Sequence, residues 1–487
     1  MRKPAIKLAA ITGFPFLLAG CVTNPDYASK DAGFRTVSAK VAEATGRQSA
    51  WVQDRQQTRM VSARVKELLA RKTIDADTAV QIALLNNKGL QAAYADLGGA
   101  AAAAWQSTML VNPIMAIGAG GLGTPEMEAF RAIEATVTTN LLALLTRERN
   151  IAIADVRYRQ AQLDAALATL QLAAETRRAW INAVSAWETV GQLNRAQIAA
   201  DAASELAEKL GESGAMSKGA QAREHAFNAE LAGRAAQARL AARLAKEELI
   251  RLMGLWGEDA KFEIPNRLPN LPKALTKRDT IEAEALRRRI DLQVAKLELE
   301  AVARSYKLTE ATRLVTDLEL MAGVETERER EDGKTKFETT GLGELEFAIP
   351  IFDSGRARMR QAELNYLRAA NQLAEKAVNI RSEARSAYQA YRASYDIARH
   401  YRDSVVPLRT KIEEEAQLTY NGMITNTFEL LADTRAKVNS VILSVNAKRD
   451  FWLADAGLQT AINGGGSGGA SASTASPAGS EEAGAGH

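Results

Sequence analysis

The chain has 487 residues with one cysteine, three histidines, and 62 Lys and Arg against 59 Asp and Glu. A near-neutral, mixed surface lacks the basic footprint of a nucleic-acid-binding protein, so no nucleic-acid partner is expected. A single cysteine excludes a disulfide framework, and no Cys or His pair has metal-ligand spacing, so neither a metal site nor an enzymatic activity is predicted.

The first twenty residues have the pattern of a secretory signal. Basic residues Arg2, Lys3 and Lys7 precede an apolar run, residues 8–18, which is too short to span a bilayer as a helix. No later segment holds the roughly 20 uninterrupted apolar residues of a transmembrane helix. If the mature chain crosses a membrane, we expect it to do so by β-strands.

The signal ends in LAGC, with Cys21 as its last residue, and this resembles the bacterial lipobox. The resemblance implies that Cys21 becomes the mature N-terminus and carries a covalent lipid, with palmitate as the expected acyl group and no other cofactor. Val22 after the cysteine resembles the outer-membrane address. An ordinary signal peptide with a chance cysteine is the alternative.

The body of the chain repeats itself. Asp77–Ala93 returns 202 residues later as Asp279–Ala295, and a glycine turn beside a Met recurs at 213–216 and 421–423. Pro-rich and Gly/Ser-rich stretches mark the breaks. The predicted segments are a lipoprotein signal peptide at 1–20, a polar and irregular lipid-anchored segment at 21–72, a first repeat at 73–261, a linker at 262–275, a second repeat at 276–463, and a disordered tail at 464–487.

Long helices dominate each repeat. Apolar and small residues alternate in steps of four and three over 355–419, the seam of a coiled coil, and 147–211 has the same spacing. Each long helix is expected to turn at the glycine site and return, over 217–255 and 425–458. Pro407 lies inside the second long helix and should kink it or interrupt one turn.

Four short strands are expected, as two hairpins between the long helices. Residues 133–141, 317–324 and 344–351 alternate apolar and polar side chains, and 109–123 is apolar and Gly-rich. This pattern is typical of transmembrane β-strands, although an amphipathic sheet of a soluble protein has it too. The run ETERERED, residues 325–332, is expected to be an exposed loop.

Four strands cannot close a barrel, and an open sheet edge is not tolerated in lipid. Closure would therefore need several copies of the chain. Two copies would supply eight strands and three copies twelve, and physical reasoning alone leaves both open.

Several segments resemble the TolC-type outer-membrane efflux family. The sharpest is IPIFDSGRARMRQAE at 349–363, the passage from the last strand into a long helix. In the first repeat its counterpart is LLALLTRERNIAIA at 141–154, in which Arg147 and Arg149 match Arg356 and Arg358. The other matching segments are TIDADTAVQIALLNN at 73–87, LIRLMGL at 249–255 and LTYNGMITNTFELLADTR at 418–435.

The resemblance implies a mainly α fold with short β-strands. A homotrimer would form a 12-stranded barrel in the outer membrane and a helical tunnel in the periplasm. The channel would conduct passively, with an inner-membrane pump and a periplasmic adaptor as partners and outer-membrane lipid around it. A periplasmic adaptor or coiled-coil scaffold lipoprotein is the alternative function.

Two sets of candidate functional residues follow. The helical turns would meet the adaptor and gate the tunnel, although their glycines could simply supply positive φ: Ser213, Gly214, Ala215, Met216, Gly422, Met423, Ile424 and Thr425. Acidic side chains would line the lumen and favour cationic cargo, or merely keep the pore wet: Asp317, Glu319, Glu344 and Glu346. Asn112-Pro113 resembles the metal-exporting branch, while drugs, organic acids and peptides remain open as cargo.

Overall fold

The computed structural model describes residues 25–120, 131–331, 334–422 and 427–465. The chain divides into two compact units, each assembled from three stretches of sequence. Unit 1 comprises Met1–Gln53, Lys88–Ala166 and Ile290–Asn379, and unit 2 comprises Asp54–Asn87, Leu167–Arg289 and Ile380–His487. The predicted signal peptide, Cys21 and residues 466–487 of the predicted tail lie outside the described residues. Gly464 and Gly465, the first two residues of that tail, are described and buried.

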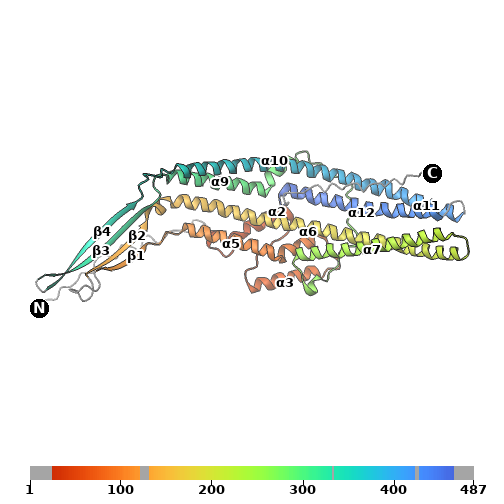
Figure 1. Cartoon of the computed structure of the whole chain (residues 1–487), viewed down its shortest axis with the longest axis horizontal. Helices are drawn as coiled ribbons and strands as arrows, with labels where there is room; N and C mark the ends of the chain where they lie inside the picture. The colour runs from red at the N-terminus through yellow and green to blue at the C-terminus, as the bar shows by residue number, and fades with distance from the viewer. Residues whose placement is uncertain (1–24, 121–130, 332–333, 423–426, 466–487) are drawn as a thin grey trace. The chain divides into compact units, whose positions relative to one another are not determined.

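Unit 1 contains one antiparallel sheet whose four strands lie side by side in chain order (Figure 1). The strands are β1 (Ile114–Gly120), β2 (Ala132–Asn140), β3 (Leu318–Glu331) and β4 (Lys334–Phe347). Its helices are α1 (Pro25–Ala28), α2 (Phe34–Thr45), α5 (Lys88–Thr108), α9 (Ile290–Ala311) and the first parts of α6 (Leu141–Glu212) and α10 (Arg356–His400). The mainly α fold with a small sheet is confirmed.

The hairpin between β3 and β4 corrects two expectations. The run 325–331 is strand rather than loop, because its backbone continues the ladder, with Glu325 paired to Thr340 and Glu327 to Glu338. At the other end β4 stops at Phe347, four residues before the expected end at Ile351. Pro350 lies in that stretch, and it lacks the N–H that a strand ladder uses.

The segment before Thr73 is helical, not irregular as its polar composition suggested. Helix α2 buries Phe34, Val37 and Val41, which are spaced three and four residues apart. A further helix, α3 (Arg55–Leu69), begins after Asp54, whose side chain accepts a hydrogen bond from the backbone N–H of Gln57. Two features of the sequence could have predicted these helices: the short amphipathic face of α2 and the capping residue Asp54 before α3.

The regular elements in the described part of unit 2 are helices and helical turns. They are α3, α4 (Ala76–Asn86), the rest of α6, α7 (Lys218–Met253), the 3-10 turn η2 (Gly257–Ala260), α8 (Ile281–Arg288), the rest of α10, the π-turn η3 (Tyr401–Val405), α11 (Val406–Asn421) and α12 (Thr427–Asn463). Leu193 and Ala200 of α6 pack against Leu231 and Ala235 of α7. Alternating large and small side chains at this seam let the two helices approach closely.

Pro407 perturbs its helix as expected. The chain runs without a break from α10 to α11, but the five residues before Val406 form the π-turn η3. Proline has no N–H to donate, and its ring would clash with the carbonyl four residues earlier, at Asp403; a wider turn relieves that clash. Within the described residues, no helix is long and apolar enough to cross a membrane.

Candidate functional site

The sheet of unit 1 has one apolar and one acidic face. Side chains alternate between the faces along a strand, and directly paired residues share a face. The β3–β4 register therefore places Glu319, Glu346 and Glu344 on one face, with Asp317 one residue before β3. The predicted acidic residues Glu319, Glu344 and Glu346 are thus brought together. The opposite face carries Met115, Ile117, Ala135, Val137, Leu320, Val324, Leu345 and Phe347.

The acidic face is larger than the sequence indicated. Glu134 pairs with Glu325 across β2 and β3, Glu327 pairs with Glu338, and Glu319 pairs with Glu346. Like charges directly opposite each other destabilise a sheet unless water or cations screen them. Sequence analysis missed Glu325 and Glu327 because it assigned them to a loop, and it missed Glu338 because register is a long-range property.

Two arginines hold the corners where strands become helices. Arg147 of α6 donates from Nη2 to the carbonyl of Thr108, the last residue of α5, at 2.5 Å. Arg358 of α10 donates from Nη2 to the carbonyl of Arg313, just beyond α9, at 3.3 Å. Each guanidinium satisfies a carbonyl at a helix C-terminus and places a positive charge there. By the carbonyl that each side chain contacts, Arg147 in the first repeat therefore corresponds to Arg358 in the second, and not to Arg356.

The first helical turn is well defined. Gly214 has φ +77°, and Ser217 caps α7 by accepting a hydrogen bond from the N–H of Ala220 at 3.2 Å. Ser213, Gly214 and Ala215 are exposed and Met216 is half-buried. Gly214 is required for its backbone conformation, and its neighbours remain accessible to a partner.

The second turn differs from the first. Gly422 caps α11 with φ −79°, so the alternative that both glycines simply supply positive φ is wrong at this position. Met423, Ile424 and Thr425 lie outside the described residues. Behind the turn, Lys437 of α12 forms an ion pair with Glu413 of α11.

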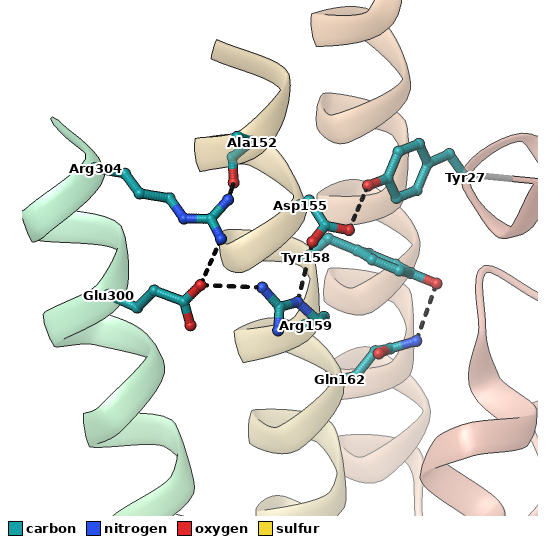
Figure 2. Close-up of polar contacts among 8 residues, drawn as sticks. All are labelled: Tyr27, Ala152, Asp155, Tyr158, Arg159, Gln162, Glu300 and Arg304. Atoms are coloured by element: carbon teal, nitrogen blue, oxygen red, sulfur yellow. Dashed lines mark hydrogen bonds and ion pairs between the residues drawn. The ribbon is translucent and has the colours of Figure 1, made fainter. Parts of the chain in front are cut away.

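Within unit 1, a polar network connects the N-terminal segment to α6 and α6 to α9, as Figure 2 shows. The Tyr27 hydroxyl donates to Asp155 at 2.9 Å, and Asp155 also accepts from Arg159 at 3.1 Å. Glu300 of α9 joins Arg159 at 3.5 Å to Arg304 at 2.6 Å. The Tyr27 and Tyr158 rings meet edge to face, 5.0 Å between centroids.

This packing buries the Tyr158 hydroxyl, and burial together with the negative charge of Asp26 raises the pKa of Tyr158 to about 12. The phenol therefore stays neutral and accepts a hydrogen bond from Gln162 at 3.0 Å. α1 is thus held against α6 by aromatic packing and hydrogen bonds within a few residues of Cys21.

A buried carboxylate without a hydrogen-bond partner among the described residues was not predicted from the sequence. Glu224 of α7 is 1% exposed, and neither of its carboxylate oxygens has a hydrogen-bond partner among the described residues. Burial raises the pKa of Glu224, against the opposing charges of Arg435 and His225. Glu224 lies on the same buried seam of α7 as Ala220 and Leu231. Its heptad position could therefore have predicted that its side chain is buried.

The described residues contain no group of three or more His, Cys, Asp or Glu side chains that could hold a metal ion. What the geometry provides is a sheet with one apolar and one acidic face, from which α6 continues directly after β2.

Solved structures with this combination of helical hairpins and a small sheet include outer membrane channels. The chain is similar to the Campylobacter jejuni CmeC outer membrane channel, with 17% identity, a TM-score of 0.67, and coverage of 80% of this chain and 86% of that one. It is also similar to VceC, an outer membrane protein of Vibrio cholerae, with 17% identity, a TM-score of 0.66, and coverage of 83% of this chain and 97% of that one. For the open state of the Neisseria gonorrhoeae MtrE outer membrane channel, the identity is 16%, the TM-score is 0.59, and coverage is 80% of this chain and 88% of that one. At identities this low, the likeness shows that the fold is shared and nothing more.

A family model matches the second part of the chain. The model of the outer membrane efflux protein family matches residues 283–464, and none of the curated proteins matches the chain. The resemblance to the TolC-type outer-membrane efflux family is thereby confirmed. The structural neighbours CmeC and MtrE are outer membrane channels.

Proposed function

We propose that this protein is the outer-membrane channel of a tripartite efflux system, conducting cargo passively from an inner-membrane pump through a periplasmic adaptor. The two-faced sheet carries this proposal. Its apolar face suits lipid and its acidic face suits water, which is the alternation of membrane-spanning β-strands. The family match to channels favours this function over the adaptor or scaffold alternative.

The protein would act as a homotrimer. β1 and β4 are the two edges of the four-stranded sheet, and an edge in lipid must pair. Three copies would join β1 of one to β4 of the next and close twelve strands, the assembly that the family resemblance implies. A lipid on Cys21 would anchor each copy to the same membrane.

The internal repeat is supported by matching contacts within unit 2. Trp180 of α6 donates from Nε1 to the carbonyl of Ile74, in the segment before α4, at 2.8 Å. Tyr388 of α10 accepts through its hydroxyl from the N–H of Arg278, before α8, at 3.2 Å. The two aromatic residues are 208 residues apart, as are the two glycines of the helical turns. Two repeats per copy would present six hairpins in a trimer, and the exposed first turn with its counterpart would meet the adaptor.

Disulfide trapping tests the assembly. Ile117→Cys in β1, combined in turn with a cysteine at Gly341, Gly343 or Leu345 of β4, places thiols on the apolar face of both edges. In at least one combination, oxidation should give covalent dimers and trimers on denaturing gels. Val137→Cys in the central strand β2, combined with the same β4 positions, is the control and should give none. Monomers in every combination would contradict a closed trimer.

The cargo we propose is cationic. Three directly opposed glutamate pairs on one sheet face would repeat in every copy and give the lumen a negative potential that concentrates cations. Glu319→Gln with Glu346→Gln should shift the reversal potential of single channels in a KCl gradient toward chloride. Glu363→Gln with Glu375→Gln, an exposed pair on α10, is the charge-matched control. An unchanged reversal potential in the lumen variant would argue for a merely wet pore.

A further inference from the structure

A groove of about 680 Å³ runs between α5 and α6 in unit 1. Its walls are mostly apolar, and Met109, Leu110, Val111 and Leu144 are exposed within it to between 39% and 55%. Apolar side chains exposed together in this way usually mark a binding surface, and the volume is in the range of ligand pockets. The groove begins at the first strand-helix corner and ends at Tyr158, about 21 Å farther along α6 at 1.5 Å per residue.

The charged residues of the groove are already engaged. Arg147 donates to the carbonyl of Thr108 and Arg157 pairs with Glu298, while Asn150 donates to the Thr146 hydroxyl. Nε of Arg147 has no hydrogen-bond partner among the described residues, but most of the other residues that line the groove are apolar. The groove is therefore suited to an uncharged hydrocarbon chain along most of its length.

The N-terminal segment lies at the far end of this groove. Tyr27 packs against Tyr158, which lines the groove, and α1 packs against α5, the other wall. Cys21 lies six positions before Tyr27, so six backbone steps reach at most about 21 Å from Tyr27. A chain tethered this closely experiences a high effective concentration at the groove.

We propose that the groove between α5 and α6 binds an acyl chain of the lipid on Cys21. The inference rests on the lipid anchor of the proposed function. The tether is short and begins beside Tyr158, and the groove runs from there to the corner at which the strands begin. The acyl chain would cover the exposed apolar side chains and extend toward the sheet. The lipid would then hold the N-terminal segment against α5 and α6 in addition to attaching the chain to the membrane.

Photo-crosslinking of the full-length protein tests this. Cells are fed a fatty acid that carries a diazirine and an alkyne, and the purified protein is irradiated and digested. The mass of the N-terminal peptide first reports whether Cys21 carries the labelled lipid. We expect crosslinks that join this peptide to peptides containing Met109–Val111 or Leu144.

Two tryptophan variants supply the comparison. Ala103 lines the groove and Ala102 is exposed on the same helix outside that lining. Ala103→Trp should lower the yield of these crosslinks by about tenfold because it overfills the groove, whereas Ala102→Trp should leave it unchanged.

The failures are distinguishable. An unlipidated Cys21 would overturn the anchor, and the groove proposal with it, while trapping of the trimer through β1 and β4 would be unaffected. A lipidated Cys21 without groove crosslinks, or with equal yields in the two variants, would overturn the groove proposal alone. So would groove crosslinks that carry a labelled phospholipid or a peptide from a second copy in place of the Cys21 peptide.

Discussion

The two strand-helix corners of unit 1 reach the same contact by different local routes. At the first corner α6 begins directly after β2, and Asn140 accepts a hydrogen bond from the N–H of Ala143 at 2.7 Å. At the second corner the residues from 348 to 355 separate β4 from α10, and Asp353 accepts from the N–H of Gly355 at 2.8 Å. Each corner then places one arginine on a carbonyl at the end of the preceding helix.

The difference shows which part of a corner is constrained. The connection tolerates a change in length, whereas the arginine contact occurs at both corners. A buried carbonyl at a helix end requires a donor, and a guanidinium can reach it from either kind of turn. The substitutions below test whether the contact or the turn stabilises each corner.

Gly355→Ala should have the largest effect, and only the second corner offers such a site. Gly355 has φ +72°, and an added Cβ would lie 2.7 Å from the carbonyl oxygen of Arg313. Strain and overlap together should destabilise the protein by about 2 to 4 kcal/mol. Thermal unfolding of the detergent-solubilised protein, followed by circular dichroism, measures the loss.

Gly214→Ala is the control for the backbone term. Gly214 has φ +77°, but an added Cβ there would meet nothing within 4 Å, so only the strain of positive φ, about 1 to 2 kcal/mol, should appear. Equal losses for the two alanine variants would mean that contact with Arg313 contributes nothing at the corner.

The arginine contacts come next. Arg147→Gln should cost about 2 kcal/mol because it removes a charged donor from the carbonyl of Thr108, whose residue is buried. Arg358→Gln should cost about 1 kcal/mol because its bond to Arg313 is longer and more exposed. The same unfolding measurement ranks them, and a larger loss for Arg358→Gln would reverse our interpretation of the two corners.

Asn140→Ala isolates the cap of the first corner. It removes the side chain that accepts from Ala143 and should cost about 1 kcal/mol, while Asn140→Asp should retain most of the stability because aspartate also caps helices well. If both variants lose stability equally, the cap is not what begins α6.

The sequence predicted the elements that repeat locally. Heptad spacing located the long helices, and alternation located β2, because both patterns follow from a fixed residue period. The interruption at Pro407 was predictable because a missing N–H acts within one turn. On the sheet, Glu319 and Glu346 could be assigned to one face from alternation alone.

Features set by pairing were not predictable. Whether Glu325 continues a strand depends on a partner strand, and the opposition of Glu327 to Glu338 depends on register. The cap by Gly422 without positive φ depends on how α11 ends, which the recurrence of a glycine did not specify. The sequence matched Arg147 with Arg356, two residues before Arg358, which makes the equivalent contact. The difference arises because the second corner contains a longer turn.

The smallest expected changes in stability test which arginines of the two repeats are equivalent. Sequence alignment matches Arg147 and Arg149 with Arg356 and Arg358, whereas the contacts match Arg147 with Arg358. Arg149 and Arg356 are both exposed, so Arg149→Gln and Arg356→Gln should each change stability by less than about 0.5 kcal/mol. Thermal unfolding of these variants beside Arg147→Gln and Arg358→Gln completes a set of four with the same charge change. A loss for Arg356→Gln as large as that for Arg147→Gln would restore the sequence alignment, because it would show that the residue equivalent by spacing, rather than by contact, holds the second corner.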